Sequence, residues 1–330
     1  MKLLVTGGLG FIASNFILRL LDKHNDIEII NIDAELPGSN HGNLSRIKEH
    51  DRYDFVKGNI SNKKFMESQI SNCDAVVNFA AESFVDRSIN DPNPFLVSNI
   101  RGAFTILDII TKQEKRMIQI STDEVFGSLE QGSANENSKL NPSNPYAATK
   151  AAAELLMNSY SITYNSDVII TRCTNNFGPR QFVEKLIPKT IILANQNLKI
   201  PIYGRGDNIR DWIYVDDHCD AVEKVLLNGK SGQSYNISAN NEIDNITIVK
   251  KILEIMNKPD DLIEFVEDRP GHDYRYSMNS NKIFNELDWK TKTSFDEGLE
   301  KTIHWYLDNP KILNDISQTV LDPTPWKNSN

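Results

Sequence analysis

The start of the chain carries a strand, a glycine-rich loop and a helix in immediate succession. The apolar run Lys2–Thr6 leads into this loop, and an amphipathic stretch over Gly10–Lys23 follows it. In this order Gly7 permits a tight turn, Gly10 lets the backbone approach a pyrophosphate, and the small Ala13 allows close helix–strand packing. The unpaired N–H groups and the positive dipole end of the helix then favour an anion. Taken alone, the loop is equally compatible with a purely structural turn.

A carboxylate after the second apolar run favours the dinucleotide interpretation. The run Ile27–Ile32 ends in Asp33, 23 residues after Gly10. At this spacing an acid can accept hydrogen bonds from a ribose diol, and it would repel a 2′-phosphate. The sequence therefore predicts NAD, rather than NADP, as the cofactor. The alternative role for Asp33 is a helix cap or a turn residue.

Short β-branched runs alternate with longer amphipathic stretches, a pattern typical of βαβ units. The short runs are almost continuously apolar, as expected for parallel strands covered by helices on both faces. After about residue 175 the loops become longer and richer in Pro, Gly and Asn. The predicted strands are Lys2–Thr6, Ile27–Ile32, Tyr53–Val56, Ala75–Phe79, Met117–Ser121, Val168–Thr174 and Ser234–Ile237, and the predicted helices are Gly10–Lys23, Lys63–Ile70, Phe95–Thr111, Pro145–Tyr160, Glu184–Asn195, Asp217–Leu227, Thr247–Met256 and Ser294–Asn309.

This alternation predicts an α/β fold, namely a Rossmann-type doubly wound parallel sheet with a smaller C-terminal α/β substrate-binding domain. We place an NAD-binding domain that carries the catalytic residues at 1–174, and a mainly substrate-binding domain at 175–330. The boundary is soft, because segments at about 210–240 can return to the main sheet.

Charge and composition restrict the partners. The chain has 330 residues, with 36 Lys and Arg against 45 Asp and Glu, so its formal net charge is −9. This surplus of acid argues against nucleic acid as the main partner. No apolar run approaches the roughly 20 residues that span a bilayer, so we expect no membrane partner. The three cysteines and the scattered histidines show no metal-ligand spacing, and we expect a cytoplasmic protein without a metal site.

Three polar residues follow the predicted strand Met117–Ser121. They are Thr122, Asp123 and Glu124. Polar groups at the carboxyl end of a parallel strand face the crevice where ligands bind in such sheets. The alternative is a solvated acidic turn.

A tyrosine and a lysine four residues apart form the second candidate group. Pro145 can open a helix that places Tyr146 and Lys150 on one face. A phenol with its ordinary pKa near 10 is a poor base at neutral pH, whereas an adjacent ammonium favours the phenolate. The pair therefore suits proton abstraction from a hydroxyl. The alternative is an exposed Tyr and Lys on an ordinary helix.

Together these motifs resemble the extended short-chain dehydrogenases/reductases and, within them, the nucleotide-sugar 4,6-dehydratases, especially the group that acts on dTDP-glucose. The resemblance covers nearly the whole chain. The triplet Thr122–Glu124 is the most informative, since related 4-epimerases and decarboxylases lack its Asp-Glu pair. Other matching segments are Thr6–Ala13, Ala80–Ser83, Ser121–Gly127, Tyr146 with Lys150, Asn175–Pro179, Glu184–Pro188, Pro201–Gly204, Arg210–Trp212 and Asp268–Asp273.

The resemblance implies an NAD-dependent hydro-lyase. Its reaction oxidises C4 of the hexose, eliminates water across C5–C6 and returns the hydride to C6, which gives dTDP-4-keto-6-deoxyglucose from dTDP-glucose. Tyr146 would remove the 4-hydroxyl proton, assisted by Lys150 and Thr122. Glu124 would take the C5 proton and Asp123 would protonate the departing hydroxyl, because two carboxyl groups in different protonation states can supply a base and an acid.

The resemblance also implies the ligand-binding residues and a homodimer, with the helices Tyr146–Tyr160 and Phe95–Thr111 packed across a two-fold axis. The implied partner is a nucleoside-diphosphate hexose. The implied cofactor-binding residues are Gly7, Gly10, Phe11, Ile12, Asp33, Asn59, Ile60, Ala80, Ala81, Ser98, Tyr146, Lys150 and Asn176, and the implied substrate-binding residues are Ser83, Thr122, Asn175, Glu184, Lys185, Leu186, Pro201, Tyr203, Arg210, Asn245, Arg269 and His272.

Several residues depart from the family pattern. Phe84 stands where the family usually has His, and Asn59 stands where Asp often contacts adenine. Ala13 replaces a third Gly, and Phe126 and Phe177 replace common Tyr residues. These departures leave the base specificity open, so the same chemistry on a UDP-, CDP- or GDP-linked hexose is the nearest alternative. A 4-epimerase, a decarboxylase and a non-catalytic NAD-dependent scaffold are more distant ones.

Overall fold

Seven parallel strands form the central sheet of the computed structural model, which describes residues 1–314 and 322–327. The strand order is β10-β6-β5-β4-β1-β2-β3, and every neighbouring pair is parallel. The order reverses direction between β1 and β4, as in Rossmann folds, so the predicted fold class is confirmed. The strands are β1 (Lys2–Thr6), β2 (Glu28–Asp33), β3 (Tyr53–Lys57), β4 (Ala75–Asn78), β5 (Arg116–Thr122), β6 (Val168–Cys173) and β10 (Ser234–Ile237).

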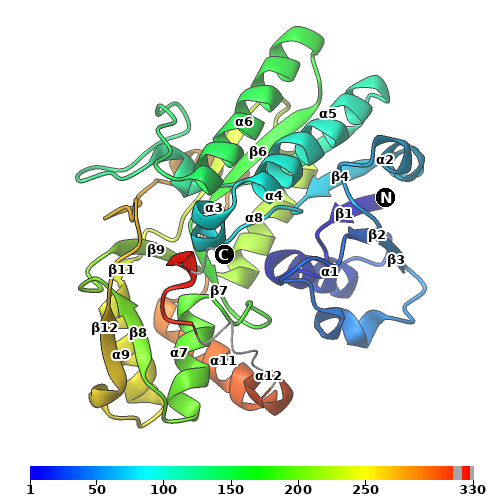
Figure 1. The fold of residues 1–330 in the computed structure, drawn as a ribbon. Helices are drawn as coiled ribbons and strands as arrows, with labels where there is room; N and C mark the ends of the chain where they lie inside the picture. Colours follow the sequence, from blue (N-terminus) through cyan, green and yellow to red (C-terminus); the bar gives the residue numbers. More distant parts are fainter. Residues whose placement is uncertain (315–321, 328–330) are drawn as a thin grey trace.

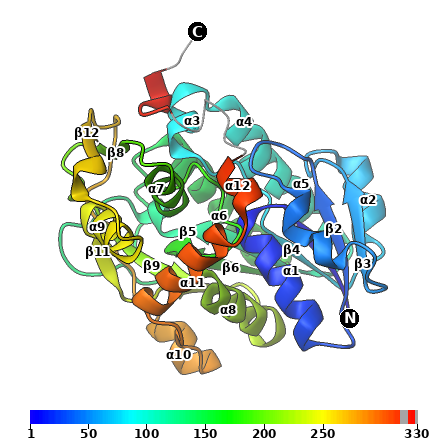
Figure 2. The same ribbon diagram turned by 90° about the horizontal axis from the view of Figure 1, so that it is seen from below.

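Helices cover both faces of this sheet. On one face α1 (Phe11–Lys23) and α8 (Val215–Asn228) lie side by side (Figure 2) and bury Phe16 and Val222 in a shared core. The opposite core takes Met66, Ile106 and Met157 from three other helices. Those helices are α2 (Lys63–Ile70), α5 (Ala103–Lys112) and α6 (Pro145–Tyr164). Burial on both faces explains the continuous apolar runs of the strands.

A chain of buried polar side chains joins the three central strands. The Thr6 hydroxyl donates to Asn78 Oδ1 at 2.5 Å, and Asn78 Nδ2 donates to Gln119 Oε1 at 2.8 Å. The Thr6 hydroxyl also accepts from the backbone N–H of Ala80 at 3.3 Å. These bonds align the carboxyl ends of β1, β4 and β5.

The smaller part of the protein contains two small sheets (Figure 1). One has the order β11-β9-β7 and the other pairs β12 with β8. Two segments after residue 174 belong with the main sheet: β10 is one of its strands, and α8 packs on α1. The predicted division at residue 174 stays a prediction. The elements of this part are β7 (Asn175–Phe177), α7 (Leu186–Asn195), β8 (Ile200–Tyr203), β9 (Ile209–Tyr214), β11 (Glu242–Asp244), α9 (Asn245–Ile255), β12 (Ile263–Val266), α11 (Phe295–Leu307) and α12 (Pro310–Asn314).

The structure corrects one predicted helix. Instead of a continuous helix over Phe95–Thr111, α4 (Asn93–Phe95) leads into a π-helical segment, η2 (Leu96–Gly102), before α5 begins. π-Helical segments are rare and short interruptions of α-helices, and the apolar spacing of this stretch predicts one continuous helix. No helix in the described ranges combines the length and apolarity needed to cross a membrane.

Truncating the central polar residue should destabilise the protein. Asn78→Ala leaves the buried Thr6 and Gln119 side chains without their partner, and we expect it to lower the free energy of unfolding by about 1–3 kcal/mol. Denaturant unfolding measures this change. The control is Asn72→Ala, which removes an exposed amide bonded to Ser68 O and should change stability by less than about 0.5 kcal/mol. Equal stability of the two variants would contradict the role of the polar chain.

Candidate active site

The glycine-rich loop forms a turn at the carboxyl end of β1. Gly7 has φ +69°, and a Cβ there would lie 2.8 Å from the backbone N and Cα of Ala80, so only glycine fits. Gly10 is the N-cap of α1 and supplies no side-chain cap. The first N–H groups of the 13-residue helix α1, at Phe11 and Ile12, therefore remain available for an anion.

Asp33, at the end of β2, holds this loop in place. Its carboxylate accepts from the N–H groups of Leu9 and Glu35, at 3.0 and 2.8 Å, and from the Ser39 hydroxyl at 2.7 Å. The predicted alternative, a turn residue, is thus part of its role. A carboxylate has about four lone-pair sites, so these three bonds leave capacity for one more donor, such as a ribose hydroxyl.

Other predicted cofactor residues also lie at the ends of the sheet strands or beside them. Ala80 and Ala81 follow β4. Asn176 lies on β7, after β6, and its buried Oδ1 has no partner among the described residues. Asn59 Oδ1 is already taken by the Ser61 N–H and hydroxyl, at 2.9 and 2.8 Å. Of the remaining two, Ile60 packs in the core beside α5, and Ser98 lies in η2.

The predicted acid and base lie in different environments at the end of β5. Thr122 caps a short 3₁₀ helix, η3 (Asp123–Phe126), by accepting from the Glu124 N–H at 3.3 Å. Asp123 is only 3% exposed, and its buried Oδ2 has no hydrogen-bond partner in the part of the chain that the structure describes. Burial, reinforced by the negative charge of Glu124, raises the pKa of Asp123 to about 8, so it is mostly protonated at neutral pH. Glu124 is half-buried and accepts from Asn144 Nδ2 at 3.3 Å and the Tyr276 hydroxyl at 3.4 Å.

Tyr146 and Lys150 lie on the buried face of α6, at 8% and 5% exposure. The helix begins at Pro145 with the Asn144 side chain as its cap, as the sequence predicted for Pro145. Burial, with Glu124 next in importance, raises the pKa of Tyr146 well above its usual value. Burial lowers the pKa of Lys150 to about 8.

The Lys150 ammonium is held by a backbone carbonyl. Lys150 Nζ donates to Ile120 O at 2.6 Å, and within the described residues it makes no hydrogen bond to the Tyr146 hydroxyl. A hydrogen bond from Thr122 favours the phenolate, but burial outweighs it. The helix spacing places both side chains on one face, as predicted, while the strand-end carbonyl takes the ammonium.

Cations from distant segments gather around Glu124. Lys185 Nζ donates to Ser83 O at 3.0 Å. Burial lowers the pKa of Lys185, and the negative charge of the nearby Glu124 opposes this decrease. Arg269 Nη1 donates to Asp86 Oδ1 at 2.9 Å, while its buried Nε has no hydrogen-bond partner among residues 1–314 and 322–327. The structure therefore brings together three predicted substrate residues, Ser83, Lys185 and Arg269, beside the predicted base.

Arg210 and His272 lie in the same region with partners of their own. Arg210 donates to the carbonyls of Ile209, Asp273 and Tyr274, at 2.7 to 3.2 Å, and its guanidinium lies 4.3 Å from the ring centre of Tyr276. Burial and the neighbouring arginines lower the pKa of His272 to about 4, so it is neutral at pH 7. His272 Nδ1 lies 2.6 Å from Asp268 Oδ1.

The other predicted substrate residues occupy varied positions. Glu184 forms an ion pair with Arg87 on α3 (Val85–Asn90). The Tyr203 hydroxyl donates to Asp86 at 3.3 Å. The remaining four begin or lie within elements of the smaller part: Asn175 opens β7, Leu186 opens α7, Pro201 lies in β8 and Asn245 opens α9.

Sequence reasoning missed several polar residues of this region. Asn99, in η2, bonds both the N–H and the carbonyl of Glu82, at 2.9 and 3.0 Å, and donates to the Thr149 hydroxyl at 3.0 Å. It ties the segment after β4 to α6. Two others are Asp86, which accepts a hydrogen bond from Arg269, and Tyr276, whose hydroxyl donates to Glu124. Their partners are far away in sequence, so no local spacing could have indicated them.

Phe84, which stands where the family usually has His, makes aromatic contacts instead of polar ones. The Phe84 ring packs edge-on against Phe182, with centroids 5.2 Å apart. The Lys185 ammonium and the Arg87 guanidinium lie 4.5 and 4.6 Å from the ring centre. The ring therefore helps to hold a cation beside the site.

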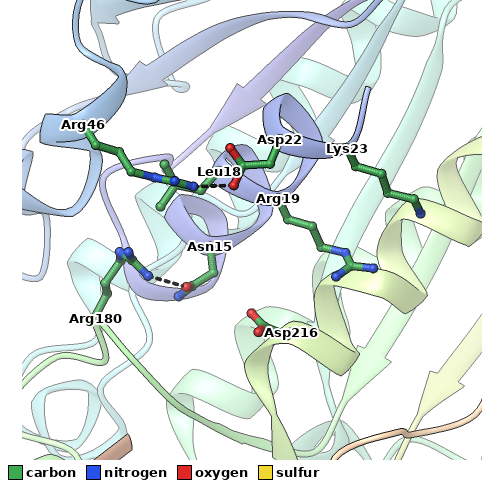
Figure 3. Close-up of a pocket in the computed structure, with 8 residues that line it drawn as sticks. All are labelled: Asn15, Leu18, Arg19, Asp22, Lys23, Arg46, Arg180 and Asp216. Carbon is green, nitrogen blue, oxygen red and sulfur yellow. Dashed lines mark hydrogen bonds and ion pairs between the residues drawn. The ribbon is translucent and has the colours of Figure 1, made fainter. Parts of the chain in front are cut away.

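A separate hollow of about 460 Å³ lies on the outer side of α1 (Figure 3). Arg180 donates to Asn15 Oδ1 at 2.9 Å, and Arg46 pairs with Asp22. None of the predicted site residues lines it. Within the described ranges, no group of three or more His, Cys, Asp or Glu residues could hold a metal ion.

The dinucleotide-type loop, the parallel sheet and the Tyr-Lys pair on α6 define an extended short-chain dehydrogenase/reductase. More narrowly, the chain belongs to the GDP-mannose 4,6 dehydratase family, whose model matches residues 4–302.

Several known proteins are similar to this chain in sequence and structure, in agreement with the family assignment. The chain is 45% identical over 308 residues to the low-salt glycan biosynthesis protein Agl12 of Haloferax volcanii, covering 93% of this chain and 99% of that one. It is 41% identical over 313 residues to dTDP-glucose 4,6-dehydratase of Mycobacterium tuberculosis, covering 94% of each. The crystal structure of dTDP-glucose 4,6-dehydratase from Bacillus anthracis in complex with NAD superposes with a TM-score of 0.89 at 42% identity, covering 94% and 98% of the two chains.

Proposed function

We propose that this chain is an NAD-dependent dTDP-glucose 4,6-dehydratase. The observation that carries the proposal is the buried carboxyl group of Asp123, whose pKa burial raises to about 8, next to the less buried Glu124 at the strand end near Tyr146. Oxidation and reduction alone need no such acid–base pair, whereas elimination of water needs both. The names of the relatives support the same reaction.

The residues around the β1–α1 junction fit NAD. The Gly7 turn and the uncapped N-terminus of α1 offer backbone N–H groups to a pyrophosphate, and Asp33 retains capacity for a ribose hydroxyl. The buried, unpartnered Oδ1 of Asn176 can accept a further donor. When bound at this junction, NAD would supply the hydride acceptor for C4 and, as NADH, the hydride donor for C6.

In the first step Tyr146 accepts the proton of the 4-hydroxyl. Burial raises the pKa of Tyr146, so its phenolate needs stabilisation. The neighbouring Thr122 hydroxyl lowers this pKa, and the buried Lys150 ammonium adds positive charge on the same helix face. In the second step Glu124 removes the C5 proton, which the 4-keto group has acidified. Asp123 donates its proton to the departing C6 hydroxyl, which leaves as water. When C6 receives the hydride, Glu124 returns its proton to C5.

The cations beside Glu124 support binding of the nucleoside diphosphate. Lys185 and Arg269 can meet its phosphate oxygens, and the unpartnered Nε of Arg269 would gain a partner there. Arg210 and the neutral His272 would contribute from the adjoining loop. Ser83, Asn175, Glu184, Leu186, Pro201, Tyr203 and Asn245 complete the substrate site that we propose.

We also propose a homodimer in the cytoplasm. Figure 1 shows α5 and α6 side by side, and their outer faces expose Phe104, Leu155, Ile162 and Tyr164. An apolar face of this kind suits an isologous contact across a two-fold axis. All three cysteines are free, which suits a reducing compartment.

A panel of nucleotide sugars tests the activity. With NAD, the protein should convert dTDP-glucose to a product lighter by one water, seen by mass spectrometry, and should leave UDP-, CDP- and GDP-hexoses largely unchanged. Water loss from another member of the panel, but not from dTDP-glucose, would show that the enzyme is specific for that other nucleotide. A C4 epimer without mass change would contradict the dehydratase function, and no turnover of any sugar would indicate a non-catalytic protein.

Removing either carboxyl group should block elimination without affecting the cofactor. We expect Asp123→Asn and Glu124→Gln to bind NAD like the wild type and to lose water about 100- to 10,000-fold more slowly, the range for losing a general acid or base. Mass spectrometry follows water loss, and NADH absorbance follows the preceding oxidation. Wild-type rates in both variants would show that the acid and base are wrongly assigned.

The rate of water loss should fall at alkaline pH. Burial raises the pKa of Asp123 and lowers that of Lys150, each to about 8, so both groups carry a proton below this pH and lose it above. Elimination should therefore be fastest below pH 8 and decline as pH rises through about 8. In Asp123→Asn the residual decline should be shallower, since only Lys150 still titrates. A rate of water loss that keeps rising above pH 8 would contradict a protonated Asp123.

A further inference from the structure

The buried face of α6 continues one turn beyond Lys150 to a carboxylate that the proposed reaction does not use. Tyr146, Lys150 and Glu154 follow one another at four-residue spacing, and Glu154 is fully buried at 0% exposure. A buried carboxylate is costly unless it is paired and hydrogen-bonded. Its partner therefore matters for the catalytic helix.

That partner is Arg172 on β6. Arg172 Nε lies 3.1 and 3.0 Å from the two Glu154 oxygens, and Nη2 lies 2.7 Å from Oε2. Arg172 is 3% exposed, and its Nη1 donates to Glu136 O at 3.3 Å. A forked guanidinium fixes direction as well as distance.

The same guanidinium also contacts the catalytic turn. It lies 5.0 Å from the ring centre of Phe126, the last residue of η3. In the sheet Arg172 is in register with Ser121, the residue before Thr122. One buried side chain therefore touches both α6, which carries Tyr146 and Lys150, and η3, which carries Asp123 and Glu124.

The Lys150 ammonium has no carboxylate bound to it among the described residues, only Ile120 O. Burial lowers its pKa, and the neighbouring Cys173 and Glu154 oppose that fall. Two unit charges a helix turn apart interact appreciably in a protein interior. The charged and titratable groups facing this region are Tyr146 and Glu154 on α6, Arg172 and Cys173 on β6, Asp123 and Glu124 on η3, and Arg210 on β9.

We infer that Glu154 and Arg172 are positioning residues for the reaction. Their ion pair locks the catalytic helix to the catalytic turn, and the Glu154 carboxylate, one helix turn along the same buried face, favours the ammonium form of Lys150. The catalytic consequence rests on the proposed function, whereas the effect on Lys150 does not.

The charge effect is tested with Glu154→Gln, which keeps the shape and an acceptor for Arg172. The measurement is the NMR titration of the labelled Lys150 side chain, assigned with Lys150→Arg, in the full-length protein without substrate. Because a negative charge is lost, the titration midpoint of Lys150 should fall by about 1 pH unit. The pH at which the rate of water loss from dTDP-glucose begins to decline should fall as well. An unchanged midpoint would overturn the inference.

The positioning effect is tested with Arg172→Lys, which keeps the charge but loses the fork and the ring contact. We expect kcat to fall by about 10- to 100-fold with little change in KM, as for a small misplacement of reacting groups. The midpoint of Lys150 should stay unchanged. Wild-type kcat in this variant would overturn the positioning role.

Glu223→Gln is the matched control. Glu223 is another buried glutamate, on α8, paired with Lys23 and Arg19, and it lies outside the proposed machinery. This variant should leave both the Lys150 midpoint and kcat unchanged. A shift equal to that of Glu154→Gln would mean that loss of any buried charge has the same effect, and would overturn the inference.

If Glu154→Gln does not fold, the pair is replaced as a whole. Glu154→Gln with Arg172→Gln leaves no unpaired buried charge, and the Lys150 midpoint should still fall, by less than in the single variant. A wild-type midpoint would overturn the inference. If wild-type protein does not turn over dTDP-glucose, the proposed function fails, while the titration of Lys150 still decides the charge effect.

Discussion

The hydrogen-bonded chain from Thr6 through Asn78 to Gln119 sets the register of the three central strands. Amide and hydroxyl groups buried in a sheet must find partners. A shift of β4 would break both bonds, and a shift of β1 or β5 would break one of them. Because this register is fixed, the glycine loop, the segment after β4 and the Thr122 turn end at the same level. The proposed cofactor site and catalytic groups therefore meet at one edge.

Burial acts differently on each catalytic group at that edge. It raises the pKa of Asp123 and so prepares an acid, and it lowers the pKa of Lys150 and so weakens a cation. It also raises the pKa of Tyr146, which opposes its use as a base. The acid is thus ready in the folded chain, whereas the base depends on nearby positive charge. This difference gives the charge of Glu154 its importance.

The sequence predicted the parts of the fold that depend on local patterns. β1, α2 and β10 begin and end where apolar spacing placed them, and most other core elements differ by one or two residues. The strands of the smaller part, β7, β8, β9, β11 and β12, were missed. Four of them have only three or four residues, which is too short for a clear periodicity, and β9 carries the polar residues Arg210 and Asp211 near its start. The residues that connect segments, such as Asn99, Asp86 and Arg172, could not be predicted either, since their partners lie far along the chain.

Net charge described the molecule as a whole but not its site. At −9 the chain should weakly repel a nucleotide sugar. Yet Lys185, Arg210 and Arg269 converge near Glu124, each held by a carbonyl or by Asp86. Cations held in this way lose little freedom when a phosphate arrives, so more of the electrostatic attraction is retained as affinity. The unpartnered Nε of Arg269 adds to this, because a buried donor without a partner gains a full hydrogen bond from the ligand. Local placement, rather than total charge, therefore decides whether this acidic protein can bind an anion.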